Sequence, residues 1–147
     1  MKNDEKAYSA MKNRPVHIRS FAPTDLEGAF ELLTAHGWGH RIPNRLFLER
    51  LITASQRVAV ATSQSQIIGF ARAITDGLSN GYLSMVVVAP EWRSQGIGKS
   101  LVDEIVKDDS NITWVLRASR SQAPEFFAKL GFAPSSEAME RSRKTRG

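Results

Sequence analysis

The chain has 147 residues, a formal net charge of +5, 41% hydrophobic and 24% charged residues, and no cysteine. This composition is typical of a globular chain with its own core, and the lack of cysteine excludes disulfides, thiolate metal sites and a cysteine nucleophile. No secretory leader or membrane-length apolar run is visible, so we expect a cytoplasmic protein without a membrane partner.

The N-terminal residues 1–14 are polar and unpatterned, which predicts a flexible arm. Residues 16–19 alternate between apolar and polar side chains and predict a strand. Thr24 and Glu27 have the spacing of a capping box and predict the start of a helix. A second helix is predicted over residues 43–54, where apolar side chains repeat at helical spacing.

The middle of the chain changes to the period of β-strands. Residues 58–61 and 67–74 are joined by a polar turn and predict an antiparallel hairpin. Tyr82 to Val88 follows as a strand with an almost continuously apolar end. We therefore expect this strand to be central in a sheet and covered on both faces.

Helices and strands alternate in the last third of the chain. The patterns predict a helix from Gly96, a strand over 112–116, a helix over 121–130 and an extended stretch from Phe132. The predicted order is β-α-α-β-β-β-α-β-α-β. This order indicates a mixed α/β sheet covered by helices, in a single domain over residues 15–140.

The last seven residues, 141–147, form a basic tail. They hold four of the 20 Lys and Arg residues, so residues 1–140 keep 16 basic and 15 acidic side chains and are nearly balanced. We expect a solvated tail, and the alternative is an arm that binds RNA or a membrane. A nucleic-acid partner is not favoured, because no aromatic RNA-binding surface or DNA-reading helix accompanies the tail.

The most informative segment runs from Val86 to Ser100, where an apolar strand ends, a turn carries Gly96 and Gly98, and a helix begins. The N-terminal end of a helix has unpaired backbone N–H groups and a partial positive charge. Glycines in the turn allow a ligand to approach the backbone closely. The segment therefore predicts an anion site, most simply for phosphate.

Two phosphate-binding motifs are excluded at this turn. A Walker A loop requires glycine five residues before Gly98, and this position is Arg93. A dinucleotide-binding fingerprint requires a third glycine at the position of Leu101. The pattern that remains is Arg-x-x-Gly-x-Gly over residues 93–98.

This pattern resembles the pyrophosphate-binding motif of the GNAT superfamily of N-acetyltransferases. Phe126 to Phe132, with the sequence Phe-Phe-Ala-Lys-Leu-Gly-Phe, is similar to a second signature of the same superfamily. The resemblance extends over residues 16–135 and is strongest to small single-domain bacterial and plastid-type amine acetyltransferases. It implies the GNAT acyl-CoA N-acyltransferase fold, acetyl-CoA as co-substrate, an amine acceptor and no metal, with a homodimer as the assembly to consider.

The resemblance also implies which residues bind acetyl-CoA. The backbone of Val86, Val87 and Val88 is expected to pair with the pantetheine arm. The residues expected to surround the pyrophosphate are Arg93, Ser94, Gln95, Gly96, Ile97, Gly98, Lys99 and Ser100.

The catalytic residues depart from the pattern of the superfamily. No carboxylate stands at positions 82, 84 or 85, where relatives carry one, and the tyrosine that commonly protonates the thiolate is replaced by Phe127. Tyr82 is the candidate base or proton relay, with core packing as the alternative. The candidate substrate residues in the loop between the first two helices are His36, Trp38 and His40, for which a surface role is the alternative.

The sequence thus predicts an acetyl-CoA-dependent N-acetyltransferase that transfers acetyl to a primary amine, of a small molecule or a protein, by direct attack in a ternary complex. The alternative is an acyl-CoA-binding module or sensor with weak or no catalysis, because Phe127 and the missing carboxylates remove the usual acid–base groups.

Overall fold

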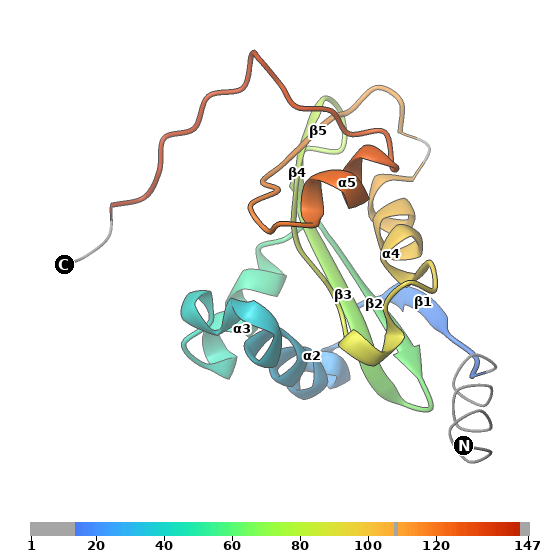
Figure 1. Ribbon diagram of the computed structural model, residues 1–147. Coiled ribbons are helices and arrows are strands. Elements are labelled where there is room, and N and C mark those ends of the chain that lie inside the picture. Colours follow the sequence, from blue (N-terminus) through green and yellow to red (C-terminus); the bar gives the residue numbers. More distant parts are fainter. Residues whose placement is uncertain (1–13, 108, 145–147) are drawn as a thin grey trace. The chain divides into compact units, whose positions relative to one another are not determined.

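A five-stranded mixed sheet lies at the centre of the first part of the chain in this computed structural model, which describes residues 14–107 and 109–144 (Figure 1). The strands lie side by side in chain order; the first four pair antiparallel, and β5 pairs in parallel with β4. The predicted fold class, a mixed α/β sheet covered by helices, is confirmed. The strands are β1 (His17–Ser20), β2 (Arg57–Ser63), β3 (Gln66–Thr75), β4 (Asn80–Val88) and β5 (Thr113–Leu116).

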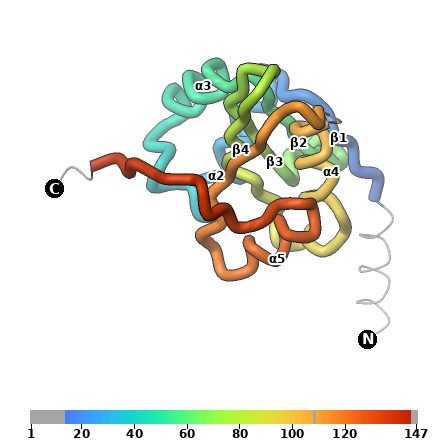
Figure 2. Tube along the Cα trace, turned by 90° about the horizontal axis from the view of Figure 1, so that it is seen from above, coloured from blue at the N-terminus to red at the C-terminus, as the bar shows by residue number. Residues whose placement is uncertain are grey.

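Helices cover both faces of this sheet (Figures 1 and 2). On one face, an added Cβ at Gly28 of α2 would lie 2.7 Å from Ile67 Cγ1 of β3. On the other face, an added Cβ at Gly69 of β3 would lie 2.9 Å from Leu101 Cδ1 of α4. Ile67 and Gly69 face opposite sides although they are two residues apart, because a β-bulge interrupts the pairing of β3 with β2 between them. Helices α2 and α4 therefore lie on opposite faces. The helices of this part are α2 (Leu26–Leu33), α3 (Arg45–Thr53) and α4 (Ile97–Val106).

Strand β4 has the central position that its apolar sequence predicts. It lies between β3 and β5, and both α2 and α4 contact it. The β2–β3 hairpin also forms as predicted, with Gln64 and Ser65 both at positive φ, 50° and 65°. Two such residues in a row give the turn the twist that matches antiparallel strands.

The buried side chain of Asp25 organises the start of α2, and the predicted capping box one residue earlier is wrong. A 3₁₀ turn, Pro23–Asp25, precedes the helix, because proline fixes the backbone for a helical start. Arg19 donates to both carboxylate oxygens of Asp25, at 2.7 and 2.8 Å, and the Ala22 N–H donates to Oδ2 at 2.8 Å. These bonds, mainly those from Arg19, hold the pKa of Asp25 below its usual value.

We expect Asp25→Asn to destabilise the protein by about 2 kcal/mol at neutral pH, because Arg19 and the Ala22 N–H lose a charged acceptor. The lowered pKa makes this contribution pH-dependent: it is fully present above the unfolded-state value of 3.8 and is lost as the pH falls through the lower folded-state value. Urea denaturation at several pH values measures both effects. Glu27→Gln is the control, because its ion pair with Arg45 is exposed and should contribute little. Equal losses would contradict the role of Asp25.

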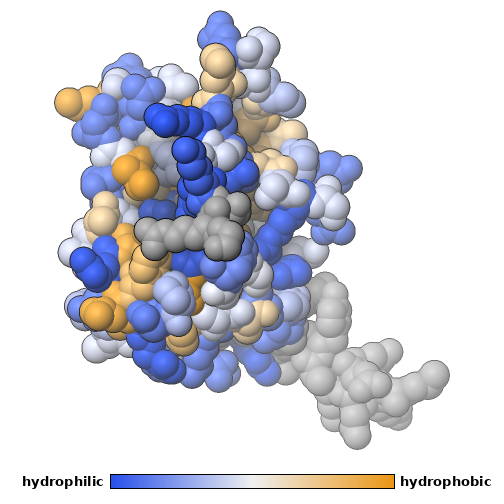
Figure 3. Space-filling view, turned by 90° about the vertical axis from the view of Figure 1, so that its left-hand side faces the viewer, coloured by the Kyte–Doolittle hydropathy of each residue, from blue (hydrophilic) through white to orange (hydrophobic). Residues whose placement is uncertain are grey.

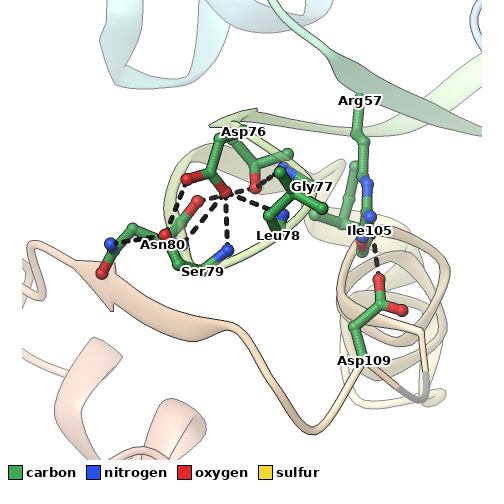
Figure 4. A network of polar contacts seen from close by, with 9 residues as sticks. Arg57, Asp76, Gly77, Leu78, Ser79, Asn80, Ile105 and Asp109 are labelled. Atoms are coloured by element: carbon green, nitrogen blue, oxygen red, sulfur yellow. Dashed lines mark hydrogen bonds and ion pairs between the residues drawn. The ribbon is translucent and has the colours of Figure 1, made fainter.

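Two further polar networks stabilise the ends of the strands (Figure 4). In the β3–β4 turn, Asp76 Oδ1 accepts the backbone N–H groups of Ser79 and of the residue before it, each at 2.8 Å, and these bonds hold the pKa of Asp76 far below its usual range. Arg57 of β2 donates to Ile105 O at 2.7 Å and forms an ion pair with Asp109. A cation at the carbonyl end of α4 compensates the helix dipole and ties this helix to the sheet.

Contacts divide the chain into two units, Met1–Leu116 and Arg117–Gly147. The second unit contains the helix α5 (Ala123–Ala128), and Gly131 follows it at a φ of +93°, the conformation that suits a glycine at a helix end. The last strand predicted from Phe132 is absent over residues 132–144. This segment contains a proline and mostly polar residues, which disfavour a strand.

No helix within residues 14–107 and 109–144 is long and apolar enough to cross a membrane. The predicted flexible arm, residues 1–14, lies outside the described residues except for Arg14, and so do residues 145–147 of the basic tail. The single domain predicted over residues 15–140 stays a prediction.

Candidate functional site

The parallel pair of β4 and β5 is short, and it leaves the end of β4 open. The two strands pair only over residues 80–83 of β4 and 113–116 of β5, whereas β4 continues to Val88. Ala89 N–H donates to Ile68 O across β3 at 2.8 Å. Because backbone groups alternate along an antiparallel strand, the N–H and C=O of Val88 point away from β3. The C=O accepts a hydrogen bond from Arg93 Nε at 3.0 Å, so the N–H is the group that remains for a ligand. An extended ligand can pair there as an additional strand does.

A β-bulge at Met85 marks the point where β4 leaves β5. Phe70 of β3 pairs with Val87 and Arg72 pairs with Ser84, so two residues of β4 stand opposite one residue of β3. Met85 has a φ of +56°, which is uncommon for a residue with a side chain. A bulge increases the local twist of its strand. This twist turns the end of β4 away from β5 and opens the edge.

The turn after β4 leads directly into α4. The first hydrogen bond inside α4 runs from Ser100 N–H to Gly96 O, at 3.0 Å. The N–H groups of the three residues between them therefore have no acceptor within the helix, at the end that carries the partial positive charge. Gly96 has a φ of +79°, and an added Cβ would have no atom within 4 Å. The space in front of this turn is open, and its backbone can bind an anion.

The cationic side chains at this turn also stabilise the turn itself. Arg93 Nε donates to Val88 O at 3.0 Å and so ties the turn to the end of β4. Lys99 forms an ion pair with Asp103 at 2.6 Å, one turn further along α4. Most of the predicted anion-site residues are exposed, whereas Ile97 and Gly98 are buried. The structure brings together at this turn Arg93, Ser94, Gln95, Gly96, Ile97, Gly98, Lys99 and Ser100, next to the open edge at Val86, Val87 and Val88.

Tyr82 belongs to the sheet face that carries α2 and α3. The register places it in one row with Ile74 of β3 and Val115 of β5, and these neighbours are 48% and 44% exposed. Gly81 faces the opposite side, because an added Cβ there would lie 2.3 Å from the ring of Trp114. The half-buried phenol of Tyr82 is thus near the opened edge of β4 and has apolar side chains on both sides.

Arg72 is a candidate functional residue that the sequence analysis missed. It lies beside Ser84 on the same face as Tyr82 and is 8% exposed. Its Nη1 donates to Ser55 Oγ at 3.0 Å, and its buried Nε has no partner among the described residues. Burial lowers the pKa of Arg72, and the phenol of Tyr82 offsets part of this shift. The signal in the sequence was a single charged residue inside the apolar segment 67–74.

The predicted substrate residues His36, Trp38 and His40 lie in the connection between α2 and α3. The connection begins as a π-helical turn, Thr34–Trp38, in which His36 leaves the helical conformation with φ −124° and ψ 46°. His36 and Trp38 are half-buried and His40 is exposed. Their contact with an acceptor stays a proposal. Among the described residues no cluster of histidine and acidic side chains could hold a metal ion.

Both polar and apolar groups are exposed on the side of α2 and α3. Helix α3 exposes Leu46 and Phe47, at 63% and 43%. Figure 3 shows the molecule from this side, where hydrophobic patches alternate with polar surface. An acceptor that approaches the sheet from here meets both kinds of surface.

Phe127, which stands where the resemblance implies a tyrosine, lies in α5 of the second unit. Its ring contacts those of Phe126 and Phe132 edge to face, with centroids 4.9 and 5.7 Å apart. It packs within a small aromatic cluster and has no proton to donate.

The comparison with known families agrees with this geometry. The profile of the family described as "Acetyltransferase (GNAT) domain" matches residues 23–143. The chain belongs to the GNAT acetyltransferase family. This membership confirms the predicted class of domain, an N-acetyltransferase domain.

Individual proteins and solved structures are similar over between about half and nine tenths of the chain. "Histone acetyltransferase TAP1" of Glycine max is 34% identical over 82 residues, which are 52% of this chain and only 34% of that protein. A GNAT acetyltransferase structure from Xanthomonas campestris is 25% identical, with a TM-score of 0.71 over 88% of this chain and 94% of the other. AAC(6')-Iy, solved with the bisubstrate analog CoA-S-monomethyl-acetylneamine, shares the fold, at 20% identity and a TM-score of 0.68 over 89% and 99% of the two chains.

Proposed function

We propose that this GNAT protein is an acetyl-CoA-dependent N-acetyltransferase that acetylates a primary amine, of a small molecule or a protein, by direct attack in a ternary complex. The observation that carries the proposal is that the open edge of β4 runs directly into the exposed N-terminal end of α4. A strand edge suits the amide-containing pantetheine arm, and a helix end suits its pyrophosphate. The CoA-based analog held by AAC(6')-Iy, a protein of the same fold, supports this assignment.

The residues present fit such a ligand. The space in front of Gly96 is open, and the N–H groups of residues 97–99 have no acceptor within the helix. Arg93 and Lys99 contribute positive charge on either side of the turn. Residues 86–88 offer the backbone of β4 to the arm, and their side chains need only pack.

The reaction requires two proton transfers that this chain must arrange. Bound acetyl-CoA supplies an activated thioester. The acceptor nitrogen forms the new C–N bond as the C–S bond breaks; the nitrogen loses a proton and the sulfur gains one. An alkylamine has a pKa of about 10, so the nitrogen must be deprotonated before it attacks. Positioning both reactants supplies a large part of the rate.

We assign Tyr82 as the proton relay, and we expect Tyr82→Phe to lower kcat by about 10-fold. General acid–base catalysis contributes roughly 10²- to 10⁴-fold, and water can replace part of a lost relay. Steady-state kinetics over a range of pH measures the loss, and the shift in Tm with CoA shows that the cofactor site is intact. An unchanged kcat would assign Tyr82 to packing. The matched variant Phe127→Tyr restores the hydroxyl of relatives and should be tolerated.

Turnover of acetyl-CoA on a panel of primary amines, followed as free thiol release, tests the proposed function. Acetylation of at least one amine supports it. Binding of CoA without turnover on any amine would instead support the acyl-CoA-binding module. The reason to consider this module is that positions 82, 84 and 85 carry no carboxylate and position 127 is Phe instead of Tyr. Salt-sensitive binding to nucleic acid that disappears on removal of residues 141–147 would support the third alternative. The cytoplasmic location and a homodimer stay predictions.

A further inference from the structure

The sheet face that carries α2 and α3, which we call the acceptor face, contains a buried cation that no anion of the described residues neutralises. Arg72 is 8% exposed, and among the described residues its side chain donates one hydrogen bond, to the neutral hydroxyl of Ser55. None of the ion pairs of the described residues includes Arg72. A buried charge without a counter-charge is costly, and proteins normally pair it. An exception of this kind is a reason to look for a ligand.

The neighbouring positions on this face carry no acid. In the register of the sheet, Arg72 and Ile74 of β3 lie beside Ser84 and Tyr82 of β4, and Val115 continues the row on β5. These five residues comprise one cation, two hydroxyls and two aliphatic groups. A site for polyamines or lysine-rich peptides would need carboxylates here. The guanidinium of Arg72, in surroundings of low dielectric, repels positively charged acceptors.

Arg72 is also close to where the reaction must occur. Its strand partner Ser84 is the first residue of β4 beyond the pairing with β5, and it precedes the bulge at Met85. The acceptor nitrogen must reach the opened edge that begins at this point. A group of the acceptor that binds Arg72 would therefore belong to the same molecule as the reacting nitrogen. It would lie on the side of that nitrogen that faces β3.

We propose that the acceptor is a small amine that also carries an anionic group, a carboxylate or a phosphate, and that this group binds the guanidinium of Arg72. The proposal rests on the proposed function, because it names the class of its acceptor. Ser55 accepts from Nη1 of the guanidinium, and the buried Nε is a donor without a partner among the described residues. A guanidinium suits carboxylate and phosphate oxygens. The exposed Ile74 and Val115 suit a short apolar body on the same molecule.

The test uses two pairs of amines, in which one member carries the anionic group and the other has a neutral group in its place. L-leucine is compared with L-leucinamide, and O-phosphoethanolamine with ethanolamine, which separates carboxylate from phosphate; spermidine is the cationic acceptor. The measured quantity is the ratio of kcat/KM for the anionic over the neutral member of each pair. Comparing this ratio between proteins cancels the different reactivity of the amines.

We expect Arg72→Gln to lower this ratio by roughly 10- to 100-fold for at least one pair, the loss of a charge-assisted, bidentate contact. Arg72→Lys should keep part of the preference. Arg50→Gln is the control, since this exposed arginine on α3 should leave the ratio unchanged. The shift in Tm with CoA verifies that each variant is folded.

Two results would overturn the proposal: a ratio that Arg72→Gln leaves unchanged, or spermidine as the best acceptor of the natural protein. If no amine is acetylated, the proposed function fails. The acceptor proposal is then decided by equilibrium titration of the same four amines into the CoA-loaded protein, where the anionic member should bind more tightly and Arg72→Gln should abolish the difference. Equal binding of both members would reject it.

Discussion

Gly96→Asp is expected to raise the Kd for CoA by at least roughly 100-fold and to abolish the shift in Tm that CoA produces. The new carboxylate would occupy the open space at the N-terminal end of α4, where we place the pyrophosphate. It would repel that anion and compete for the same N–H groups. Titration calorimetry and thermal unfolding with CoA, ATP and NAD measure the effect, and only CoA should shift the natural protein strongly.

The matched control for this experiment is Gly77→Asp. Gly77 has nearly the same backbone conformation as Gly96, φ +74° against +79°, and an added Cβ there also meets no atom within 4 Å. Both variants therefore carry the same strain and the same charge, but Gly77 lies in the β3–β4 turn. CoA should bind Gly77→Asp normally. Natural affinity in Gly96→Asp would show that this turn does not hold the pyrophosphate.

Gly81→Ala is expected to destabilise the protein by about 3 kcal/mol, at the upper end of the range for overpacking. The added Cβ would lie 2.3 Å from Trp114 Cζ3 and 2.4 Å from Cε3, so the indole must move. The guanidinium of Arg57, 5.5 Å from the ring centroid on the same side of the sheet, restricts this movement. Urea denaturation measures the loss. Gly39→Ala is the control, because Gly39 has a φ of −57° and an added Cβ there would lie 3.4 Å from its nearest atom.

A double variant tests the cause of this loss. Trp114→Leu removes the atoms that the new methyl would meet, so Gly81→Ala should cost much less in that background than in the natural protein. Strict additivity of the two substitutions would show that the methyl disturbs something other than the indole. Because Gly81 and Trp114 form one of the four pairs that join β4 and β5, the same variants also measure the stability of this pairing beside the site.

The cofactor turn could be predicted from the sequence because its chemistry is local. An apolar strand, two glycines and a helix start follow each other within 15 residues, and the structure has all three in place, with Gly96 in the left-handed conformation. The hairpin turn at Gln64 and Ser65 and the central strand β4 were predictable for the same reason.

The acceptor side could not be predicted, because it depends on pairing between distant strands. The position of Arg72 beside Ser84 follows from the β3–β4 register, which includes the bulge at Met85. Nothing in the local sequence marks Met85 as a residue at positive φ. The hydrogen bond between Arg72 and Ser55, 17 positions apart, likewise appears only in the fold. The predicted capping box of Thr24 and Glu27 was wrong for a local reason, because Pro23 begins a 3₁₀ turn that sets the start of the helix.

The bulge has a consequence for redesign, because it resets the alternation of side chains along β4. Before it, Tyr82 and Ser84 face α2 and α3; after it, Val87 takes that face, opposite Phe70 of β3. The strand therefore consists of two segments, and in each segment the choice of residues that face α2 and α3 is independent of the other. The residues of β4 before Met85 can be replaced together to make a new acceptor surface, while the segment that leads to α4 keeps its orientation. Deleting Met85 would instead turn one segment inside out.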